Sequence, residues 1–354
     1  MDFTLNDDQT TITSLAAQLL KDHCTPEALR GNEDSAEPGF DRALWAKLAE
    51  AGLLGVGLPE ADGGLGLGFL EVCLLLEEVG RYAAAVPVLA AAVGGLTLAR
   101  HGGDLTGLAD GSRIVAPALV EPLGDELAPA TTATADGRLI GTKTCVPSGL
   151  YADAFLVTAA TPEGPRLFLV EAAEVTVERQ DTISYRPEAL VLLDGAQGTL
   201  IGGADAVTDA VALATTAVSA VQLGTADAAV KLTATYTMTR EQFGHPIAHF
   251  QAVGQRAADC FIDTLTIRLT VLQAAWLLAQ RLPADKEVAV AKYFASDAGQ
   301  RVVRAAAHLH GGMGVSREYP LHRYYVAAKQ YELTLGGGTR QLARLGRLLA
   351  EEPV

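Results

Sequence analysis

The spacing of the apolar residues changes twice along this 354-residue chain, and these changes constrain the fold more than any single motif. Residues 1–112 and 204–354 repeat apolar side chains at the intervals of amphipathic helices. Residues 113–203 instead carry short β-rich runs such as "AFLVTAA" and "RLFLVEA", separated by turn formers such as Asp136-Gly137. The sequence therefore predicts an α+β fold: an N-terminal α-helical domain, a middle antiparallel β domain and a C-terminal four-helix-bundle domain, bounded by these ranges.

Two apolar seams in the last third of the chain predict a pair of long antiparallel helices. A short connector, "QRLPADKE", separates them, so the chain must turn back on itself. Small residues along both seams allow the two helices to approach closely. The seam positions are Phe250, Val253, Ala257, Cys260, Thr264, Ile267, Val271 and Ala274 in the first helix, and Val288, Ala291, Ala295, Ala298, Val302 and Ala305 in the second.

The composition excludes a disordered chain and disfavours some partners. Hydrophobic residues make up 49% of the chain, enough for a buried core. A formal net charge of −15 disfavours non-specific binding to nucleic acid or anionic lipid. The start "MDFTLNDDQT" lacks the basic and apolar regions of a secretion signal. The apolar run "AAAVPVLAAAVGGLTLA" is interrupted by Pro and Gly, which favours a buried helix over a membrane span. We therefore expect a cytoplasmic protein without membrane or nucleic-acid partners.

The cysteines and histidines do not form a metal-binding pattern. The four cysteines are far apart and lack ligand spacing, so we expect reduced, buried thiols. The histidines of "AHLHGGMGVSREYPLHRYY" have no carboxylate at ligand spacing, so we expect no metal site. The residues concerned are Cys24, Cys73, Cys145, Cys260, His308, His310 and His322.

The segment "TREQFGHPIAHFQAV" (239–253) carries the most specific candidate binding residues. Arg240 offers a forked cation that suits a phosphate group. Phe243 offers a flat apolar face, and Gln251 offers an amide for hydrogen bonds. Each residue has an ordinary structural explanation when taken singly, but their spacing together favours a shared ligand site.

Two glycine-rich segments follow it. Gly311 and Gly312 come after a long helix, where they either let a ligand approach the backbone or simply end the helix. The run "LTLGGGT" (333–339) interrupts a helical tail, because glycine inside a helix costs about 1 kcal/mol relative to alanine.

Five segments, in order, resemble the acyl-CoA dehydrogenase family: "FDRALWAKLAEAGLLGVGLPEADGGLG", "EEVGR", "TREQFGHPIAHFQAV", "HLHGGMGVSREYPLHRYY" and "LTLGGGTRQLARLGRLLA". The resemblance spans nearly the whole chain and is weakest in the β domain. It implies an FAD flavoprotein, a dimer or dimer of dimers, that oxidises the Cα–Cβ bond of an acyl-CoA thioester. In the family, flavin accepts hydride from Cβ, hydrogen bonds polarise the thioester carbonyl, and a carboxylate removes the α-proton.

By this resemblance, the usual catalytic carboxylate is missing. Most members carry it as the Glu of a Tyr-Glu-Gly-Thr stretch near the C-terminus, and Gly337 stands at that position here. A minority carry it on an earlier helix, where this chain has Ala214 and Thr215. The nearest carboxylate upstream of those two residues is Asp209.

The resemblance divides the family's flavin contacts into a kept set and a lost set. The residues that a subunit contributes to its neighbour's flavin match here, except that a histidine replaces a glutamine. These are Arg240, Phe243, Gln251, His308, Gly311 and Gly312. Among the contacts to a subunit's own flavin, Val120 replaces a Thr, Cys145 a Trp and Pro147 a Thr, and only Thr339 persists.

This asymmetry predicts one subunit of a heteromeric, α2β2 acyl-CoA dehydrogenase of lipid or steroid degradation. A homologous partner chain would supply the catalytic Glu and most of the isoalloxazine pocket, and the two chains would share FAD. A steroid-CoA or another bulky acyl-CoA is the expected substrate by analogy. Three alternatives stay open: an active homo-oligomer with an unidentified base such as Asp209, a flavin-dependent monooxygenase of the same fold, and a structural scaffold with an empty pocket.

Overall fold

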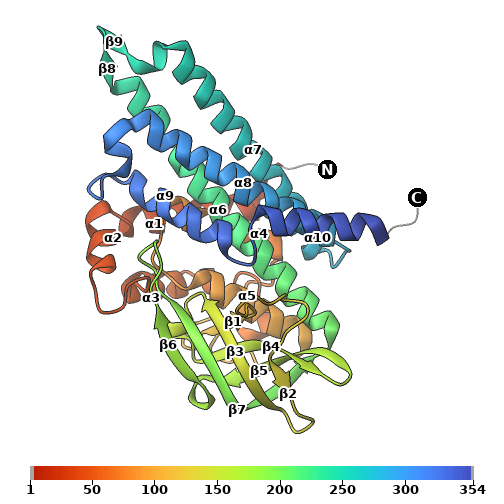
Figure 1. Cartoon of the computed structure of the whole chain (residues 1–354). Coiled ribbons are helices and arrows are strands. Elements are labelled where there is room, and N and C mark those ends of the chain that lie inside the picture. Colours follow the sequence, from red (N-terminus) through yellow and green to blue (C-terminus); the bar gives the residue numbers. More distant parts are fainter. Residues whose placement is uncertain (1–3, 352–354) are drawn as a thin grey trace.

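The computed structural model describes residues 4–351, and its elements follow the predicted order of helices, strands and helices (Figure 1). The N-terminal helices are α1 (Asp7–His23), α2 (Pro26–Glu33), α3 (Arg42–Glu50), α4 (Phe69–Arg81) and α5 (Val88–His101). The strands are β1 (Val115–Ala118), β2 (Thr132–Ala133), β3 (Arg138–Val146), β4 (Ala154–Thr161), β5 (Gly164–Glu171), β6 (Thr176–Gln180) and β7 (Glu188–Gly202). The C-terminal elements are α6 (Ala204–Thr239), β8 (Glu241–Gln242), β9 (His245–Pro246), α7 (Gln251–Ala279), α8 (Asp285–His310), α9 (Leu321–Leu333) and α10 (Gly338–Glu351).

Local sequence signals explain where the N-terminal helices begin and end. Asn6 starts α1 with a capping box, because its side chain accepts from the N–H of Gln9 and its own N–H donates to the Gln9 side chain. Asp41 caps α3 through its side chain alone, which accepts from the backbone N–H groups of Ala43 and Leu44. The apolar stretch 69–102 is divided into α4 and α5 by Pro87, which follows α4 and immediately precedes α5.

The β domain is a closed sheet and not a purely antiparallel one. Its pairings run β4–β5–β7–β3–β2 and return to β4, with β1 on β4 and β6 on β7. The predicted antiparallel arrangement is wrong for two pairs, because β1 and β2 both lie parallel to β4. Both parallel pairs are possible because a long stretch of chain that includes β3 separates β1 and β2 from β4, and a pattern of short runs and turns gives no sign of them.

The predicted helix pair is present as α7 and α8, joined by residues 280–284. All six predicted seam positions of α8 are buried, as are those of α7 from Cys260 onwards. The three seam positions of lowest number, Phe250, Val253 and Ala257, are only partly buried. Together with α6 and α9 these helices form the predicted bundle, and α10 lies against α8 (Figure 1).

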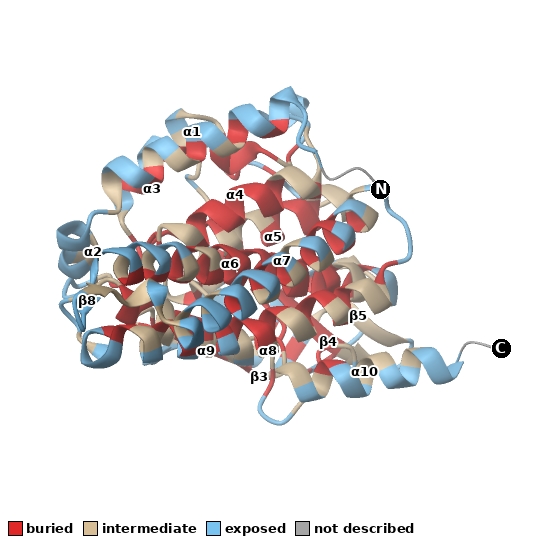
Figure 2. Ribbon diagram, turned by 90° about the horizontal axis from the view of Figure 1, so that it is seen from above, coloured by how far each residue is buried: buried red, intermediate tan, exposed pale blue. Residues whose placement is uncertain are grey.

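Helix α6 forms the centre of the molecule, and it is coloured as buried along most of its length in Figure 2. It packs against α4 through two glycines. A Cβ on Gly80 would overlap the carbonyl oxygen of Val221, and a Cβ on Gly224 would overlap that of Glu77. Only glycine allows this distance between the two helix backbones.

Two helices, α6 and α7, are long and apolar enough to cross a bilayer by length and composition. The most apolar window of α6 is 89% buried, so its apolarity is explained by its central position. The corresponding window of α7 is only 39% buried. Helix α7 therefore presents an apolar face outward, and its exposed residues Phe261, Ile262, Leu265 and Leu269 form what we call the α7 face.

The cysteines are all free, but the expectation of four buried thiols is wrong in part. Cys73 and Cys260 are buried, Cys24 is half-buried and Cys145 is exposed. Cys145 adopts a left-handed φ of 50° near the end of β3, in a register shift that turns its side chain out of the sheet. Within residues 4–351, no group of three or more His, Cys, Asp or Glu side chains is arranged to hold a metal ion.

Candidate functional site

Arg240 lies at the end of α6, where its backbone is fixed and its side chain is free. Its N–H donates to the carbonyl of Tyr236, and its carbonyl accepts from the N–H of Ile247, both at 2.8 Å. Its exposed guanidinium has no hydrogen bond or ion pair to any residue in the described range 4–351. A positioned but unpaired guanidinium suits a phosphate group that comes from outside the chain.

Phe243 lies at the tip of the β8–β9 hairpin. Phe243 and Gly244 both have positive φ, 56° and 83°, which is the signature of a tight type I′ turn. This conformation is unfavourable for a bulky residue, and the Phe243 side chain is 89% exposed. Its ring contacts the edge of Phe250, with centroids 6.0 Å apart. The hairpin therefore presents an aromatic face to the outside.

Gln251 is the first residue of α7 and is exposed. The next intrahelical donors, Val253 and Gly254, both bond to the carbonyl of Phe250. The side-chain amide of Gln251 has no partner among the described residues. This helix start therefore offers a free amide beside backbone N–H groups that carry partial positive charge.

The end of α8 lies beside the end of α6. His310 is buried, and its ring stacks on Tyr236 with centroids 4.3 Å apart. Its Nε2 lies 3.2 Å from the hydroxyl of Tyr319. Burial lowers the pKa of His310, which favours a neutral ring in this stack. The sequence analysis did not single out this stack, although Tyr236 comes only four residues before Arg240.

This stack places His308, Gly311 and Gly312 at the same end of the bundle as Arg240, Phe243 and Gln251 (Figure 1). A Cβ added at Gly311 or Gly312 would meet nothing within 4 Å, so the backbone there faces open space. We call these six residues the bundle end. The structure thus brings together six of the seven predicted cofactor-binding residues.

Thr339 is the exception. It lies in the first turn of α10, and its neighbour Gly338 packs near the ring of Tyr293 in the middle of α8. Tyr293 is 15 residues from His308, or about 22 Å along a helix axis. The structure therefore separates Thr339 from the bundle end.

Gly337 lies in the loop between α9 and α10. The buried Lys292 Nζ donates to the carbonyls of Tyr331 and Glu332, at 2.5 and 3.3 Å, and so satisfies the end of α9. A Cβ at Gly337 would meet only the Glu332 carbonyl, at an ordinary 3.6 Å. A side chain would therefore fit at Gly337, so steric crowding does not explain why this position carries no carboxylate.

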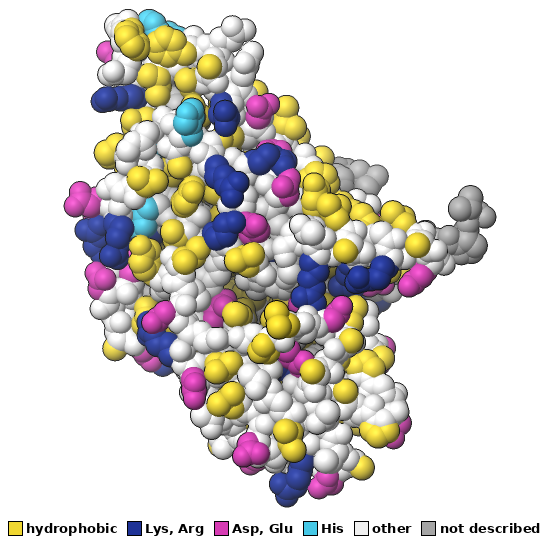
Figure 3. Space-filling model, in the orientation of Figure 1, with side chains coloured by type: hydrophobic (Ala, Val, Ile, Leu, Met, Phe, Trp, Pro, Cys, Tyr) yellow, Lys and Arg dark blue, Asp and Glu magenta, His cyan; other side chains and the backbone are white. Residues whose placement is uncertain are grey.

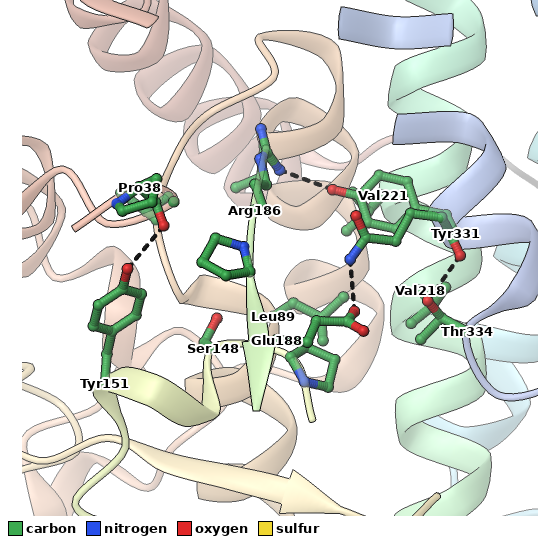
Figure 4. A pocket seen from close by; sticks show the side chains of 16 residues that line it. Pro38, Leu89, Ser148, Tyr151, Arg186, Glu188, Val218, Val221, Tyr331 and Thr334 are labelled. Carbon is green, nitrogen blue, oxygen red and sulfur yellow. Dashed lines mark hydrogen bonds between the residues drawn. The ribbon is translucent and has the colours of Figure 1, made fainter. Parts of the chain in front are cut away.

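A cavity of about 70 Å³ lies where the three domains meet (Figure 4). Apolar side chains from α4, α5 and α6, including Val79, Leu89 and Val218, form much of its wall. Glu188 is the carboxylate among its lining residues, and its carboxyl accepts from Gln330 Nε2 at 2.6 Å. Burial raises the pKa of Glu188 to about 7. The sequence analysis missed Glu188, because only the packing of the β domain on the C-terminal helices brings the start of β7 against α9.

Asp209, the candidate base of an active homo-oligomer, is not in this cavity. Its carboxylate pairs with Arg100 at 2.6 Å and with His101 at 3.1 Å. It lies nine residues before Val218 on α6, about 13 Å along the helix axis. Ala214 and Thr215, between them, are buried and carry no carboxylate. The geometry therefore gives Asp209 a structural role, as an ion-pair partner.

The residues present fit FAD at the bundle end and not on the side of the β domain. At the bundle end, an unpaired guanidinium, a free amide, an aromatic ring and an open backbone suit a dinucleotide. Pro147, which lines the cavity, lacks an N–H, and Val120, in the loop before β2, has an apolar side chain, so neither provides a polar hydrogen to a flavin ring. The kept and lost sets are thus separated in space as well as in sequence.

Comparison with known proteins shows two matches to family models. Residues 6–105 match the family model described as the acyl-CoA dehydrogenase N-terminal domain, and residues 202–349 match that of the C-terminal domain. The chain is 41% identical to acyl-CoA dehydrogenase FadE27 of Mycobacterium tuberculosis (strain ATCC 25618 / H37Rv), covering all of both chains.

Two solved structures are similar over nearly the whole chain. A variant of the Tcur3481-Tcur3483 steroid ACAD is 44% identical with a TM-score of 0.94, covering 98% of this chain and 99% of the other. A chain of the ChsE4-ChsE5 complex from Mycobacterium tuberculosis is 41% identical with a TM-score of 0.94, covering all of both chains.

Proposed function

Because this chain belongs to the acyl-CoA dehydrogenase family, oxidoreductases that act on CH–CH bonds, we propose that it is the base-lacking subunit of a heteromeric, α2β2 acyl-CoA dehydrogenase. In this proposal the bundle end completes an FAD site whose other half belongs to a homologous partner subunit. The partner provides the catalytic carboxylate and most of the isoalloxazine pocket.

The observation that carries this proposal is the unpaired Arg240 at the bundle end. An exposed arginine that is fixed by its backbone and lacks any described partner has no evident role within the isolated chain. Phe243 lies exposed beside it at a conformational cost. Both features are explained if a ligand held mainly by another chain is bound here.

The α7 face supports the existence of that other chain. Phe261 and Ile262 are 63% and 60% exposed, and Leu265 and Leu269 are 42% and 40% exposed. Figure 3 shows apolar side chains at the β8–β9 end of the molecule and along the edge where Figure 1 places α7. Contiguous exposed apolar surface of this kind is typical of a protein–protein interface. Because α7 begins at the bundle end, a partner on this face would lie next to Arg240.

FAD, when bound, supplies the acceptor for a hydride from Cβ of the thioester. The roles we assign to this chain concern binding: Arg240 neutralises a phosphate, Gln251 bonds to a polar atom of the dinucleotide, and Phe243 covers an apolar face. Gly337 places no proton acceptor beside the thioester, so the α-proton must be removed by the partner's carboxylate. We propose a steroid-CoA or similarly bulky thioester as the substrate class, in line with the steroid ACAD that this chain resembles.

The test is co-expression with homologous chains encoded nearby, followed by measurement of complex mass and flavin absorbance. Arg240→Ala should weaken flavin binding roughly 10- to 150-fold, because a charge-assisted hydrogen bond contributes about 1.5–3 kcal/mol. Arg240→Lys should recover part of this loss, since it keeps the charge but not the fork. Arg347→Ala, an exposed arginine on α10, is the matched control and should leave the flavin unchanged.

One FAD per chain and acyl-CoA turnover by the isolated protein would contradict the proposal. Asp209→Ala distinguishes the homo-oligomer, because the proposal predicts unchanged turnover per flavin in that variant.

A further inference from the structure

Arg340 connects α10 to the β domain. Its Nη2 donates to the carbonyl of Gly124 at 2.9 Å and to Glu126 Oε2 at 2.7 Å. Gly124 and Glu126 lie on the same loop as Val120, and Arg340 follows Thr339 directly. Two segments that resemblance assigns to the chain's own flavin are therefore bonded to each other.

A second connection joins β7 to α9. Gln330 donates to Glu188 at 2.6 Å and accepts from Thr182 at 3.1 Å, and Ser184 also donates to it. Glu188 is buried and lies close to Cys145. This network again ties the strand side of the cavity to the helix that precedes "LTLGGGT".

A third connection joins all three domains. Arg186, just before β7, donates to the hydroxyl of Tyr331 on α9 at 2.8 Å and to the carbonyl of Ala83 after α4 at 2.6 Å. Figure 4 shows this bond and the Glu188–Gln330 bond spanning the cavity from the β domain to α9. The second and third connections bond the β-domain side of the cavity to α9, and the first bonds the loop that contains Val120 to α10.

We propose that these pairs, Arg340–Glu126, Glu188–Gln330 and Arg186–Tyr331, form a clamp that closes this chain's own flavin half-site. A flavin placed between the β domain and the helices α9 and α10 has to break the clamp, and the chain then loses partly buried hydrogen bonds that Val120, Cys145 and Pro147 cannot replace. The chain therefore takes part in flavin binding only through its bundle end, and its own cavity stays closed in the complex. This inference rests on the proposed function and adds the contacts that prevent a second flavin from binding.

The test uses the co-expressed complex and compares hydrogen–deuterium exchange of residues 120–130 and 333–341 with and without excess FAD. In the wild type we expect one flavin per two chains. We also expect that added FAD leaves the exchange rate of both segments unchanged. Arg340→Ala and the isosteric Glu126→Gln should each increase exchange in residues 120–130 several-fold. Arg347→Ala is the matched control, because Arg347 lies on the same helix and is exposed.

Slower exchange in either segment when FAD is added to the wild type would overturn the clamp. The clamp would also be overturned if Arg340→Ala and Glu126→Gln both exchanged as slowly as the wild type. These outcomes are distinct from failure of the proposed function. If flavin content falls in Arg240→Ala while residues 120–130 respond to FAD, the shared site stands and the clamp is wrong. If Arg240→Ala leaves the flavin content unchanged, the proposed function fails, whatever the hydrogen–deuterium exchange shows.

Discussion

Glu188 shows at the scale of one residue how burial changes a side chain's chemistry. Its carboxyl is enclosed among apolar side chains, and its pKa rises from an ordinary 4.5 to about 7. Between these two pH values the native state binds more protons than the unfolded state, so the contribution of Glu188 to stability falls as the pH rises. Above pH 7 the buried charge imposes its full cost.

Glu188→Gln should remove this dependence. The amide oxygen still accepts from Gln330, but no charge forms. The free energy of unfolding of the variant, relative to wild type, should increase by up to about 3 kcal/mol between pH 4.5 and pH 8. Urea unfolding at both pH values measures it. Glu178→Gln, an exposed substitution on β6, is the control and should follow the wild type. An equal pH dependence in Glu188→Gln and wild type would show that this carboxyl does not titrate as described.

At the residue scale, the sequence predicts which residues lie together where a short segment holds them. Arg240, Phe243 and Gln251 lie within twelve residues of one another, and a single hairpin brings them together. Thr339 is far from them in the fold. The sequence did not predict this separation, because similarity to a family motif carries no information on distance. Glu188 could not be found from sequence, since a lone glutamate at the start of a strand is indistinguishable from a surface charge until its neighbours are known.

The contact between α4 and α6 is decided at the scale of whole elements. Gly80 and Gly224 let the two backbones approach, and Glu77, Arg81 and Asp227 form a cluster of ion pairs beside the contact. Arg268 of α7 joins it at 2.9 Å from Glu77. Three helices from two domains therefore meet at one point that tolerates no extra atom.

Gly224→Ala should separate α4 from α6, because its new methyl group overlaps the Glu77 carbonyl. Overpacking of this kind costs about 1–3 kcal/mol, which thermal unfolding would show as a lower Tm. Gly254→Ala is the control, since nothing lies within 4 Å of its added Cβ on exposed α7. That variant should be neutral or more stable, by up to about 1 kcal/mol. A Gly224→Ala protein as stable as wild type would mean that the two helices can shift freely.

At the scale of the whole molecule, the α7 face is the surface that the isolated chain leaves uncovered. Phe261→Ser combined with Leu265→Ser should weaken partner binding at least about 30-fold, since central interface side chains contribute about 2 kcal/mol or more. Light scattering after size-exclusion chromatography measures the mass of the complex. Leu200→Ser changes an apolar side chain of the β domain that is 48% exposed, and it should leave the mass unchanged. An intact complex in the double variant would place the partner elsewhere.

The sequence by itself determined the order of helices and strands, the antiparallel pair α7 and α8, and the residues of the bundle end. These depend on periodicity and on short segments, which are local properties of a chain. Only the tertiary structure decided that β1 and β2 run parallel to β4, that Thr339 lies apart from Arg240, and that Arg340, Glu188 and Arg186 bond the β domain to the C-terminal helices. The physical reason is that sheet closure and domain packing bring together residues that are distant in the sequence, by more than a hundred positions in the contacts between domains, and no local pattern records those contacts.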